Sequence, residues 1–400
     1  MNSIKKITNY VFDRYKVTDK VAFFINEEYI FDHYSSVMEG LDSNIFDIVL
    51  EDKFKQKKYE SLINKLTLNS WSVLFLSDVL YLRKYKVLLT HLYLGGSTAS
   101  SGTMLLRVKL IIFKLMKVIG IIWLKEPPKQ YFQNILGVSN IRFMYGADAG
   151  GVKFGKYNYL FDEFFCHGPR DSGIIRKKFD RPVYEMGYPR YDSYFDKLND
   201  KGLRCNLLKK YLCNHKKPTI LWICTVSEYF STIEKYEGLM YKFTKKYNVI
   251  LRPHPMEIDP QYRRYKKNVH DIVNSGQFII SSDPYQEMFD LYLIADFVFC
   301  DYGGSIFSAL YVNKKIVLMD HEFVSMDFEV YQSTSMEVRK YLPTIREIEG
   351  CDIDKKLLDS GFWNNGSENK KKARREYFGS HEGNSAKNTA VRIMEILSYE

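Results

Sequence analysis

Short apolar runs alternate with longer amphipathic stretches along most of the chain, a pattern that predicts strands and helices in turn. Because the runs are apolar at consecutive positions, they are typical of strands buried on both faces of a parallel sheet. The first half of the chain holds such runs at 20–25, 46–50, 72–77, 86–93, 141–145, 161–166 and 183–187. The second half holds them at 219–224, 248–251, 278–280, 297–300 and 316–319.

The alternation of apolar runs and amphipathic stretches is interrupted once, between the two halves of the chain. The sequence therefore predicts two α/β domains in tandem. We expect a first domain over 1–195, a charged helical connector over 196–217 and a second domain over 218–345. The segment 346–400 is predicted to be helical and to pack back across the domains. Ligands of such sheets bind beyond the carboxyl ends of the strands, so we expect the functional residues to lie there.

Charge and composition narrow the classes of partner. The chain has 58 Lys and Arg residues against 48 Asp and Glu, which favours nucleic acid, anionic membranes or phosphorylated substrates. A hydrophobic content of 46% excludes a disordered protein. The six cysteines form no Cys-x-x-Cys pair, so no structural zinc is expected. The first 20 residues lack the apolar core of a secretory signal, which predicts a cytoplasmic protein.

The segment 103–125 is strongly apolar but carries basic residues. Arg107, Lys114, Lys117 and Lys125 fall on one side of a helical wheel, and a single lysine falls on the other. No stretch of about 18 uncharged apolar residues is present, which disfavours a membrane-spanning helix. The pattern predicts a helix lying in a membrane interface; the alternative is a buried helix whose lysines reach solvent.

The strongest local motif is Asp-Tyr-Gly-Gly-Ser at 301–305, between an apolar strand and an amphipathic helix. Glycines allow close approach of the backbone, and a helix start offers free N–H groups and the positive end of the helix dipole. The motif therefore predicts a phosphate site. The alternative is a plain turn in which Ser305 caps the helix.

A second motif, Arg-Pro-His-Pro at 252–255, directly follows a strand. Arg252 can bind phosphate through two hydrogen bonds, and His254 can donate to a leaving phosphate or relay a proton near neutral pH. The alternative is a rigid turn with a surface histidine. Thr225 and Ser227 follow the strand at 219–224, where hydroxyls bind phosphate or ribose, or cap a helix.

Candidates for a general base lie in the first domain. Asp148 belongs to a glycine-rich turn at 145–153, where it can take a proton from an acceptor hydroxyl or simply cap the turn. His91 and His167 each follow a strand and are further candidates. A single histidine in such a place is more often a core or surface residue than a catalyst.

Taken in order, these motifs resemble the CDP-glycerol glycerophosphotransferase family of teichoic-acid polymerases and primases, over about residues 140–325. The segment 187–192 (Gly-Tyr-Pro-Arg-Tyr-Asp) resembles the element that closes the family's acceptor domain. The loop 252–255 matches the family's Arg-Pro-His-Pro in full. The segment 301–305 takes the place of the family's Asp-Tyr-Ser-Ser, with a glycine for the first serine and one residue added, and Asp320 matches a family acidic position near the donor.

The resemblance implies a GT-B fold, in which two Rossmann-like domains face a central cleft and the C-terminal one holds the nucleotide donor. It also implies a peripheral location on the inner face of the cell membrane. The expected donor-binding residues are Arg252, Thr225, Ser227, Asp301, Gly303, Gly304, Ser305 and Asp320.

Family catalysis is attributed to two histidines, of which His254 is one. The other belongs to a His-Gly-Thr-Pro-like motif, whose place here is taken by Tyr-Gly-Ala-Asp at 145–148. Asp148 is therefore the expected substitute base, with His91 and His167 as alternatives. No cofactor and no metal are expected, because no dense carboxylate cluster is visible in the sequence.

The implied reaction moves a polyol phosphate, glycerol phosphate first of all, from a CDP-linked donor to a hydroxyl of a cell-surface glycan or lipid-linked acceptor, and releases CMP. One alternative is a GT-B glycosyltransferase that uses a nucleotide sugar in surface polysaccharide synthesis. A second is a binding protein that kept the diphosphate site and lost the base. Nucleic-acid binding through the basic run 370–375 is disfavoured, because no nucleic-acid-binding signature accompanies it.

Overall fold

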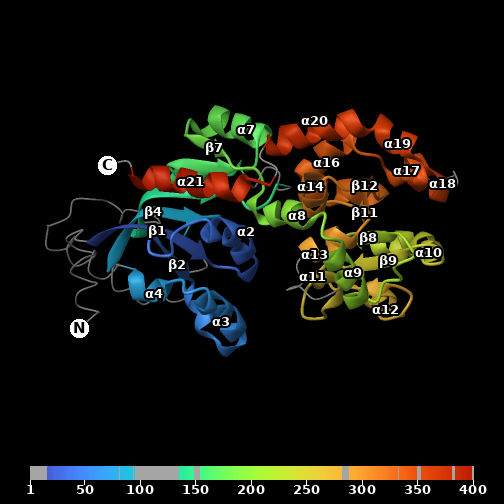
Figure 1. The fold of residues 1–400 in the computed structure, drawn as a ribbon, viewed down its shortest axis with the longest axis horizontal. Helices are drawn as coiled ribbons and strands as arrows, with labels where there is room; N and C mark the ends of the chain where they lie inside the picture. The colour runs from blue at the N-terminus through green and yellow to red at the C-terminus, as the bar shows by residue number, and fades with distance from the viewer. Residues whose placement is uncertain are drawn as a thin grey trace.

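The computed structural model describes residues 16–80, 82–92, 94, 135–147, 154–281, 288–331, 333–348, 353–380 and 383–398. These residues form two separate parallel sheets flanked by helices (Figure 1). The first sheet has the order β3-β2-β1-β4-β5-β6-β7, and the second has the order β10-β9-β8-β11-β12. In both sheets the chain starts in the middle, builds outward to one edge and then crosses back to build the other half.

The strands coincide with the apolar runs of the sequence. In the first sheet they are β1 (Lys16–Ile25), β2 (Phe46–Leu50), β3 (Val73–Phe75), β4 (Arg83–Thr90), β5 (Gly137–Phe143), β6 (Glu163–Cys166) and β7 (Val183–Glu185). In the second they are β8 (Thr219–Ile223), β9 (Asn248–Arg252), β10 (Ile279–Ile280), β11 (Phe297–Cys300) and β12 (Lys315–Leu318). Every strand predicted from the sequence is confirmed, with shifts of a few residues at the ends.

The α-helices fill the intervals between the strands. Those up to the connector are α2 (Glu28–Glu39), α3 (Glu60–Leu68), α4 (Leu76–Val79), α7 (Pro169–Phe179), α8 (Asp192–Lys197) and α9 (Lys201–Lys210). Those around the second sheet are α10 (Thr232–Phe243), α11 (Pro255–Ile258), α12 (Lys267–Val273), α13 (Met288–Ile294), α14 (Gly304–Tyr311), α15 (Phe328–Tyr331) and α16 (Thr334–Val338). The C-terminal ones are α17 (Ile345–Ile348), α18 (Ile353–Leu358), α19 (Ser360–Asn365), α20 (Ser367–Phe378) and α21 (Ser385–Ser398).

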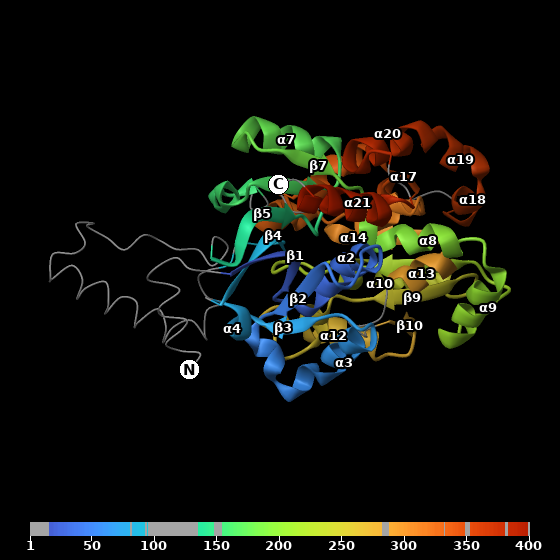
Figure 2. The same cartoon turned by 60° about the vertical axis from the view of Figure 1, so that its left-hand side comes forward.

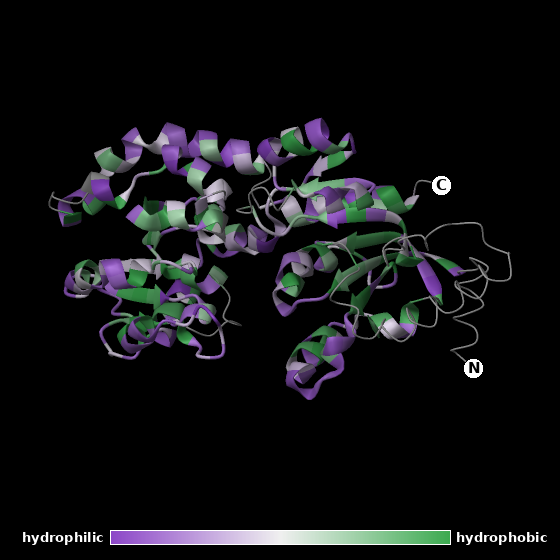
Figure 3. Cartoon of the chain, turned by 180° about the vertical axis from the view of Figure 1, so that it is seen from behind, coloured by the Kyte–Doolittle hydropathy of each residue, from purple (hydrophilic) through white to green (hydrophobic). Residues whose placement is uncertain are grey.

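Short 3₁₀ helices complete the connections. They are η1 (Asp52–Lys55), η2 (Lys57–Tyr59), η4 (Lys156–Leu160), η5 (Pro189–Tyr191), η6 (Glu322–Met326) and η7 (Arg339–Tyr341). The strands carry most of the apolar colour in the interior, and the outer faces of the helices are polar (Figure 3). Central strands such as β2 and β8 are buried at every position, as expected for sheets with helices on both faces.

The last helix returns to the first sheet. Helix α21 lies beside α2, β1 and β4, and both views show it over the first sheet although it ends the chain (Figures 1 and 2). Its Ala386, Ala390 and Ile393 are buried in one hydrophobic cluster with Val21 and Phe23 of β1. Residues from both ends of the chain therefore build the core of the first domain.

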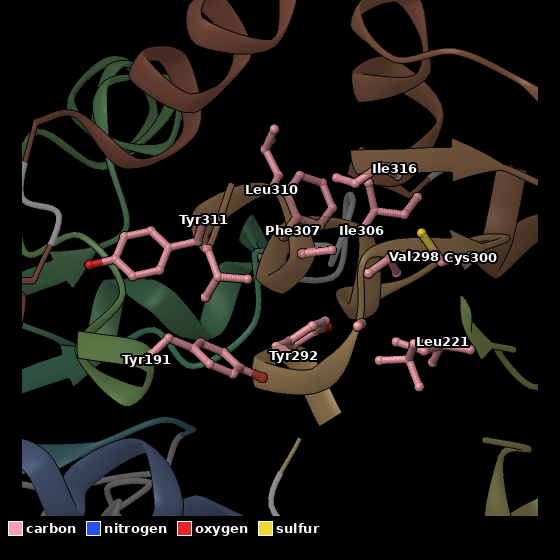
Figure 4. Packing of buried hydrophobic residues seen from close by; sticks show 14 of the residues in the cluster. Tyr191, Leu221, Tyr292, Val298, Cys300, Ile306, Phe307, Leu310, Tyr311 and Ile316 are labelled. Atoms are coloured by element: carbon pink, nitrogen blue, oxygen red, sulfur yellow. The ribbon is translucent and has the colours of Figure 1, made fainter. Parts of the chain in front are cut away.

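The segment 187–192 lies where the two sheets meet. Figure 4 shows Tyr191 in one apolar cluster with Tyr292 and Tyr311 of the second sheet's helices. The Tyr311 hydroxyl donates to Asp192 at 2.8 Å, and the backbone N–H of Ala386 donates to the same carboxylate at 2.6 Å. A single buried carboxylate thus ties α14 and α21 to the segment that joins the domains.

The sequence suggests roles for two charged segments, 370–375 and 103–125. The basic run 370–375 lies in α20, where Lys370 donates to the carbonyl of Lys314 and Arg374 donates to the carbonyl of Tyr311. Arg374 therefore satisfies the carbonyl of the last residue of α14, where positive charge is favoured by the helix dipole, and Lys370 binds just beyond that end. The segment 103–125 lies outside the described residues. Within the described part of the chain, no helix combines the length and apolar character that crossing a membrane requires.

Candidate active site

The carboxyl ends of β8 and β11 meet in the middle of the second sheet, where the order of strands reverses. In open parallel sheets this is the usual place for a ligand, because the loops after the two strands part in opposite directions. The loop 224–231 follows β8, and the segment 301–305 follows β11. The loop 252–255 follows β9, which pairs with β8. Asp320 follows β12, which pairs with β11, so all the expected donor-side residues lie at or just after neighbouring strand ends.

Asp301 is a structural anchor between these loops. Its carboxylate is fully buried and accepts hydrogen bonds from the backbone N–H groups of Thr225 (2.9 Å) and Tyr302 (2.6 Å) and from the Thr232 hydroxyl. Burial raises the pKa of Asp301 to about 6, and these hydrogen bonds oppose the shift. Its oxygens accept from protein donors and are shielded from solvent, and its expected contact with the donor stays a prediction.

Ser227 has a similar position. Its side chain is fully buried and donates to the Asp327 carboxylate at 2.8 Å, and the backbone N–H of Glu228 donates to the same oxygen at 3.3 Å. The expected contact of Ser227 with the donor likewise stays a prediction. Thr225 is only partly buried, and its expected contact with the donor stays a prediction.

The start of α14 has the conformation that the glycines predict. Gly303 adopts φ 81° and ψ −164°, a region that is essentially restricted to glycine. Gly303, Gly304 and Ser305 are partly exposed, whereas Asp301 and Tyr302 before them are buried. The first turn of α14 therefore presents backbone N–H groups toward solvent at the end of β11, which is the geometry of an anion site.

His254 is held as a neutral hydrogen-bond donor. Its Nδ1 accepts from the backbone N–H of Met256 at 3.2 Å, which leaves the proton of the neutral ring on Nε2. Burial, together with the nearby Arg264 and Arg252, lowers the pKa of His254 to about 4. The guanidinium of Arg252 donates to the Ser281 hydroxyl at 2.9 Å and is partly exposed. Both side chains therefore present N–H groups at the end of β9.

Asp320 is paired with arginines. Its carboxylate forms ion pairs with Arg339 and, at 3.4 Å, with Arg346. Arg339 also donates to the carbonyls of Asp301 and Met319 and lies 4.6 Å from the centre of the Tyr302 ring. Asp320 therefore helps to fix the ends of β11 and β12 through Arg339, and its expected contact with the donor stays a prediction.

The first domain contributes a group of buried histidines at the carboxyl edge of its sheet. His91 follows β4 and His167 follows β6, and both are almost completely buried. The ring of Tyr145, after β5, is 5.1 Å from that of His91 and 5.6 Å from that of His33 on α2. The structure thus brings the two histidine candidates to one edge of the sheet. Asp148 lies outside the described residues.

His91 is a poor proton acceptor in the structure. Burial, followed by the charges of Arg142 and Lys53, lowers the pKa of His91 to about 3. A general base works best with a pKa near the working pH, so this environment disfavours His91 as the base. His167 has a carboxylate nearby, since its Nδ1 lies 3.7 Å from Asp171.

Sequence reasoning missed several residues that organise the site. Thr232, Asp327, Arg339, Glu257 and Lys266 all hold its loops through buried or half-buried hydrogen bonds. None stands at a strand end or in a motif, so only the fold identifies them.

Among the described residues, no group of three or more His, Cys, Asp or Glu side chains is arranged to hold a metal ion.

Comparison with known families decides the class. The model of the CDP-glycerol:poly(glycerophosphate) glycerophosphotransferase family matches residues 172–395, which is more than half of the chain. The chain belongs to this family. The match includes the segment 187–192 and every donor-side loop described above, whereas His91, Tyr145 and His167 precede it. The protein is therefore a CDP-glycerol glycerophosphotransferase-like enzyme, and the part that it shares with the family runs from α7 to α21.

Solved structures show the same architecture for the glycerophosphotransferase-like chain. The wall teichoic acid polymerase TagF, in a histidine-to-asparagine variant soaked with CDPG, is 14% identical with a TM-score of 0.62, and the match covers 99% of this chain and 96% of that one. UDP-GlcNAc 2-epimerase from Neisseria meningitidis bound to UDP-GlcNAc is 13% identical with a TM-score of 0.53, covering 94% and 99%. At these identities the likeness shows the fold alone. The search of curated proteins found no match.

Proposed function

We propose that the enzyme transfers glycerol phosphate from CDP-glycerol to a hydroxyl of a cell-surface glycan or lipid-linked acceptor and releases CMP. The observation that carries this proposal is the convergence of the loop 252–255 and the start of α14 at the strand reversal of the second sheet. That convergence occurs in a chain that belongs to a glycerophosphotransferase family. Both loops present N–H donors, and a diphosphate is the part of the donor that such groups bind.

In this reaction the acceptor oxygen attacks the β-phosphorus of the donor. A new oxygen–phosphorus bond forms, the bond to the bridging oxygen breaks, and its electron pair leaves on CMP. Arg252, the Nε2–H of His254 and the first N–H groups of α14 stabilise the charge that develops on the diphosphate. Thr225, Gly303, Gly304 and Ser305 line the same edge, while Asp301, Ser227 and Asp320 hold the loops in place.

The acceptor proton goes to a base of the first domain. We keep Asp148 in this role, because it stands at the place of the family's second histidine and because burial disfavours His91. We further propose that residues 1–195 serve the acceptor and residues 218–345 the donor. The basic apolar segment 103–125 would attach the enzyme to the inner face of the membrane, where a lipid-linked acceptor is found.

A panel of donors tests this function. The enzyme, with detergent and a lipid-linked acceptor pool, is offered CDP-glycerol, CDP-ribitol and UDP-, GDP- and CMP-sugars, and the released nucleotide is identified. Release of CMP from CDP-glycerol, lost in His254→Ala, is the expected result. Release of UDP or GDP would instead assign the chain to the glycosyltransferases. Binding of nucleotide without release from any donor would favour the binding-protein hypothesis.

A further inference from the structure

Lys266 lies between two of the loops that form the donor side, although no sequence motif includes it. It immediately precedes α12, and its ammonium group is largely buried. The group donates to the carboxylate of Glu257 at 3.0 Å, to the carbonyl of Phe230 at 3.0 Å and to the carbonyl of Ser227. A lysine ammonium has three donors, so each of them has an acceptor here.

Glu257 connects this ammonium to His254. It lies in α11, is fully buried, and its backbone N–H donates to the carbonyl of His254 at 3.0 Å. Its own carbonyl accepts from the backbone N–H of Lys266 at 2.9 Å. Glu257 therefore links His254 to Lys266, through one backbone contact with His254 and through one backbone and one side-chain contact with Lys266.

The carboxyl group of Glu257 is in an unusual environment. Burial raises its pKa to about 7, with Lys266 opposing the shift and Asp301 and Glu234 adding to it. Within the described part of the chain, its second oxygen is buried without a hydrogen-bond partner. A buried carboxylate with one oxygen that makes no hydrogen bond lowers the stability of the folded state. Stability alone therefore does not account for the pair of Glu257 and Lys266.

Two other residues, Asp301 and Asp327, tie the loop 225–231 to different parts of the second domain. Asp301 ties Thr225 to the end of β11, and Asp327 ties Ser227 and Glu228 to the segment after η6. Lys266 adds the tie to the β9 side, where Arg252 and His254 lie. The three anchors together define where the loop stands relative to both phosphate-binding motifs.

We propose that Lys266, held by Glu257, is a positioning residue for the nucleotide donor. It sets the loop 225–231 against the loop 252–255, so that groups on both loops reach one diphosphate. The inference rests on the proposed function only for the identity of the donor; any nucleoside diphosphate bound at this edge needs the same spacing.

The first test replaces Lys266 by methionine, which fills similar space without a charge. Lys267→Met is the matched control, because Lys267 is the next residue, is exposed and carries the same charge. We expect Lys266→Met to raise KM for CDP-glycerol about tenfold with kcat changed less than about threefold, as loss of binding shared by ground and transition states requires. Lys266→Arg should restore most of the affinity, because it keeps the charge and the donors.

The second test needs no turnover. Hydrogen exchange in the full-length protein should speed up about tenfold in 225–231 in Lys266→Met and in Glu257→Gln, with 304–311 unchanged. Affinity for CDP, measured by calorimetry, should fall in the same two variants and not in Lys267→Met. These readouts stand even if the wild type releases no CMP, an outcome that would reject the proposed function alone. Unchanged exchange and unchanged CDP affinity, or equal losses in Lys267→Met, would overturn the role of Lys266.

Discussion

Burial and neighbouring arginines set the protonation state of two histidines, His254 after β9 and His91 after β4. The pKa of His254 lies at about 4 and that of His91 at about 3, so both rings are neutral near pH 7. For His254 this leaves one N–H to donate to a diphosphate oxygen, and the charge of the bound diphosphate would raise its pKa again. For His91 the same effect makes protonation a cost to the folded state.

Replacing His91 by glutamine tests that cost. Because the folded-state pKa of His91 is depressed from 6.5 to about 3, the unfolded chain binds the proton first, and the wild type loses stability as the pH falls below about 6.5. Glutamine does not titrate, so the stability of the variant relative to the wild type should rise by about 2 kcal/mol between about pH 7 and about pH 5.

Urea unfolding of both proteins at the two pH values measures this difference, and titration of groups that do not interact with His91 cancels in the comparison. Groups that face His91, namely Arg142, Lys53 and His33, are unchanged in the variant. Parallel loss of stability in the two proteins would show that His91 takes up its proton normally in the folded state.

Single residues also show how much of the candidate site can be predicted from the sequence. Arg252, His254 and the glycines at 303–304 could be predicted because motif and strand end coincide there. Asp301 and Ser227 stand just as close to strand ends, but the sequence does not reveal that buried protein groups occupy their oxygens. Arg339 and Lys266 reach the site from distant segments, so only the tertiary structure identifies them.

At the scale of elements, α14 links donor chemistry to domain packing. Its first turn forms the candidate phosphate site, and its last residue, Tyr311, bonds to Asp192. Arg374 of α20 donates to the carbonyl of Tyr311 at the same end, and Lys370 donates to the carbonyl of Lys314 just beyond the helix. Positive charge at that end and a bound anion at the other both suit the helix dipole.

The glycine before α14 supplies a test with an internal control. Gly303→Ala forces a side chain into a φ that only glycine adopts readily, and should cost about 1–3 kcal/mol of stability and weaken CDP binding. Gly304 is the first residue of the helix, and Gly304→Ala should change stability by less than about 1 kcal/mol. Denaturant unfolding and calorimetry of the two variants measure both effects. Equal costs for the two substitutions would contradict a conformational role for Gly303.

The elements themselves follow from the apolar runs. Runs such as 46–50 and 297–300 become strands at the predicted bounds, because helices bury them on both faces. The strand β4 instead starts at Arg83, earlier than its apolar run. There Arg83 pairs with the exposed beginning of β1 and reaches Asp47, so backbone pairing extends the strand beyond the buried core.

At the scale of the molecule, the two ends of the chain depend on each other. The helix α21 packs on β1 and β4, and its first residue, Ser385, contacts the junction of the domains through a hydroxyl that is hydrogen-bonded to Tyr311 at 2.9 Å. The sequence predicts that the C-terminal segment is helical. The partner of that helix depends on contacts between residues hundreds of positions apart, which local patterns do not encode.

A pair of substitutions on α21 tests this dependence. Ile393 is fully buried against the first sheet, so Ile393→Ala should lower the free energy of unfolding by about 2–5 kcal/mol. Val391, two residues away, is 43% exposed, and Val391→Ala should change it by less than about 0.5 kcal/mol. Urea unfolding followed by tryptophan fluorescence and circular dichroism checks both. Similar small effects would mean that α21 does not stabilise the first domain.

The transfer of the β-phosphate is the central claim, and a labelled donor tests it most directly. CDP-glycerol carrying ³²P in the phosphate next to glycerol is incubated with the enzyme and a lipid-linked acceptor, and the products are separated. The account predicts label in the extended acceptor, unlabelled CMP, and loss of both in His254→Ala. Label that stays with the released nucleotide, or glycerol transferred without its phosphate, would contradict it.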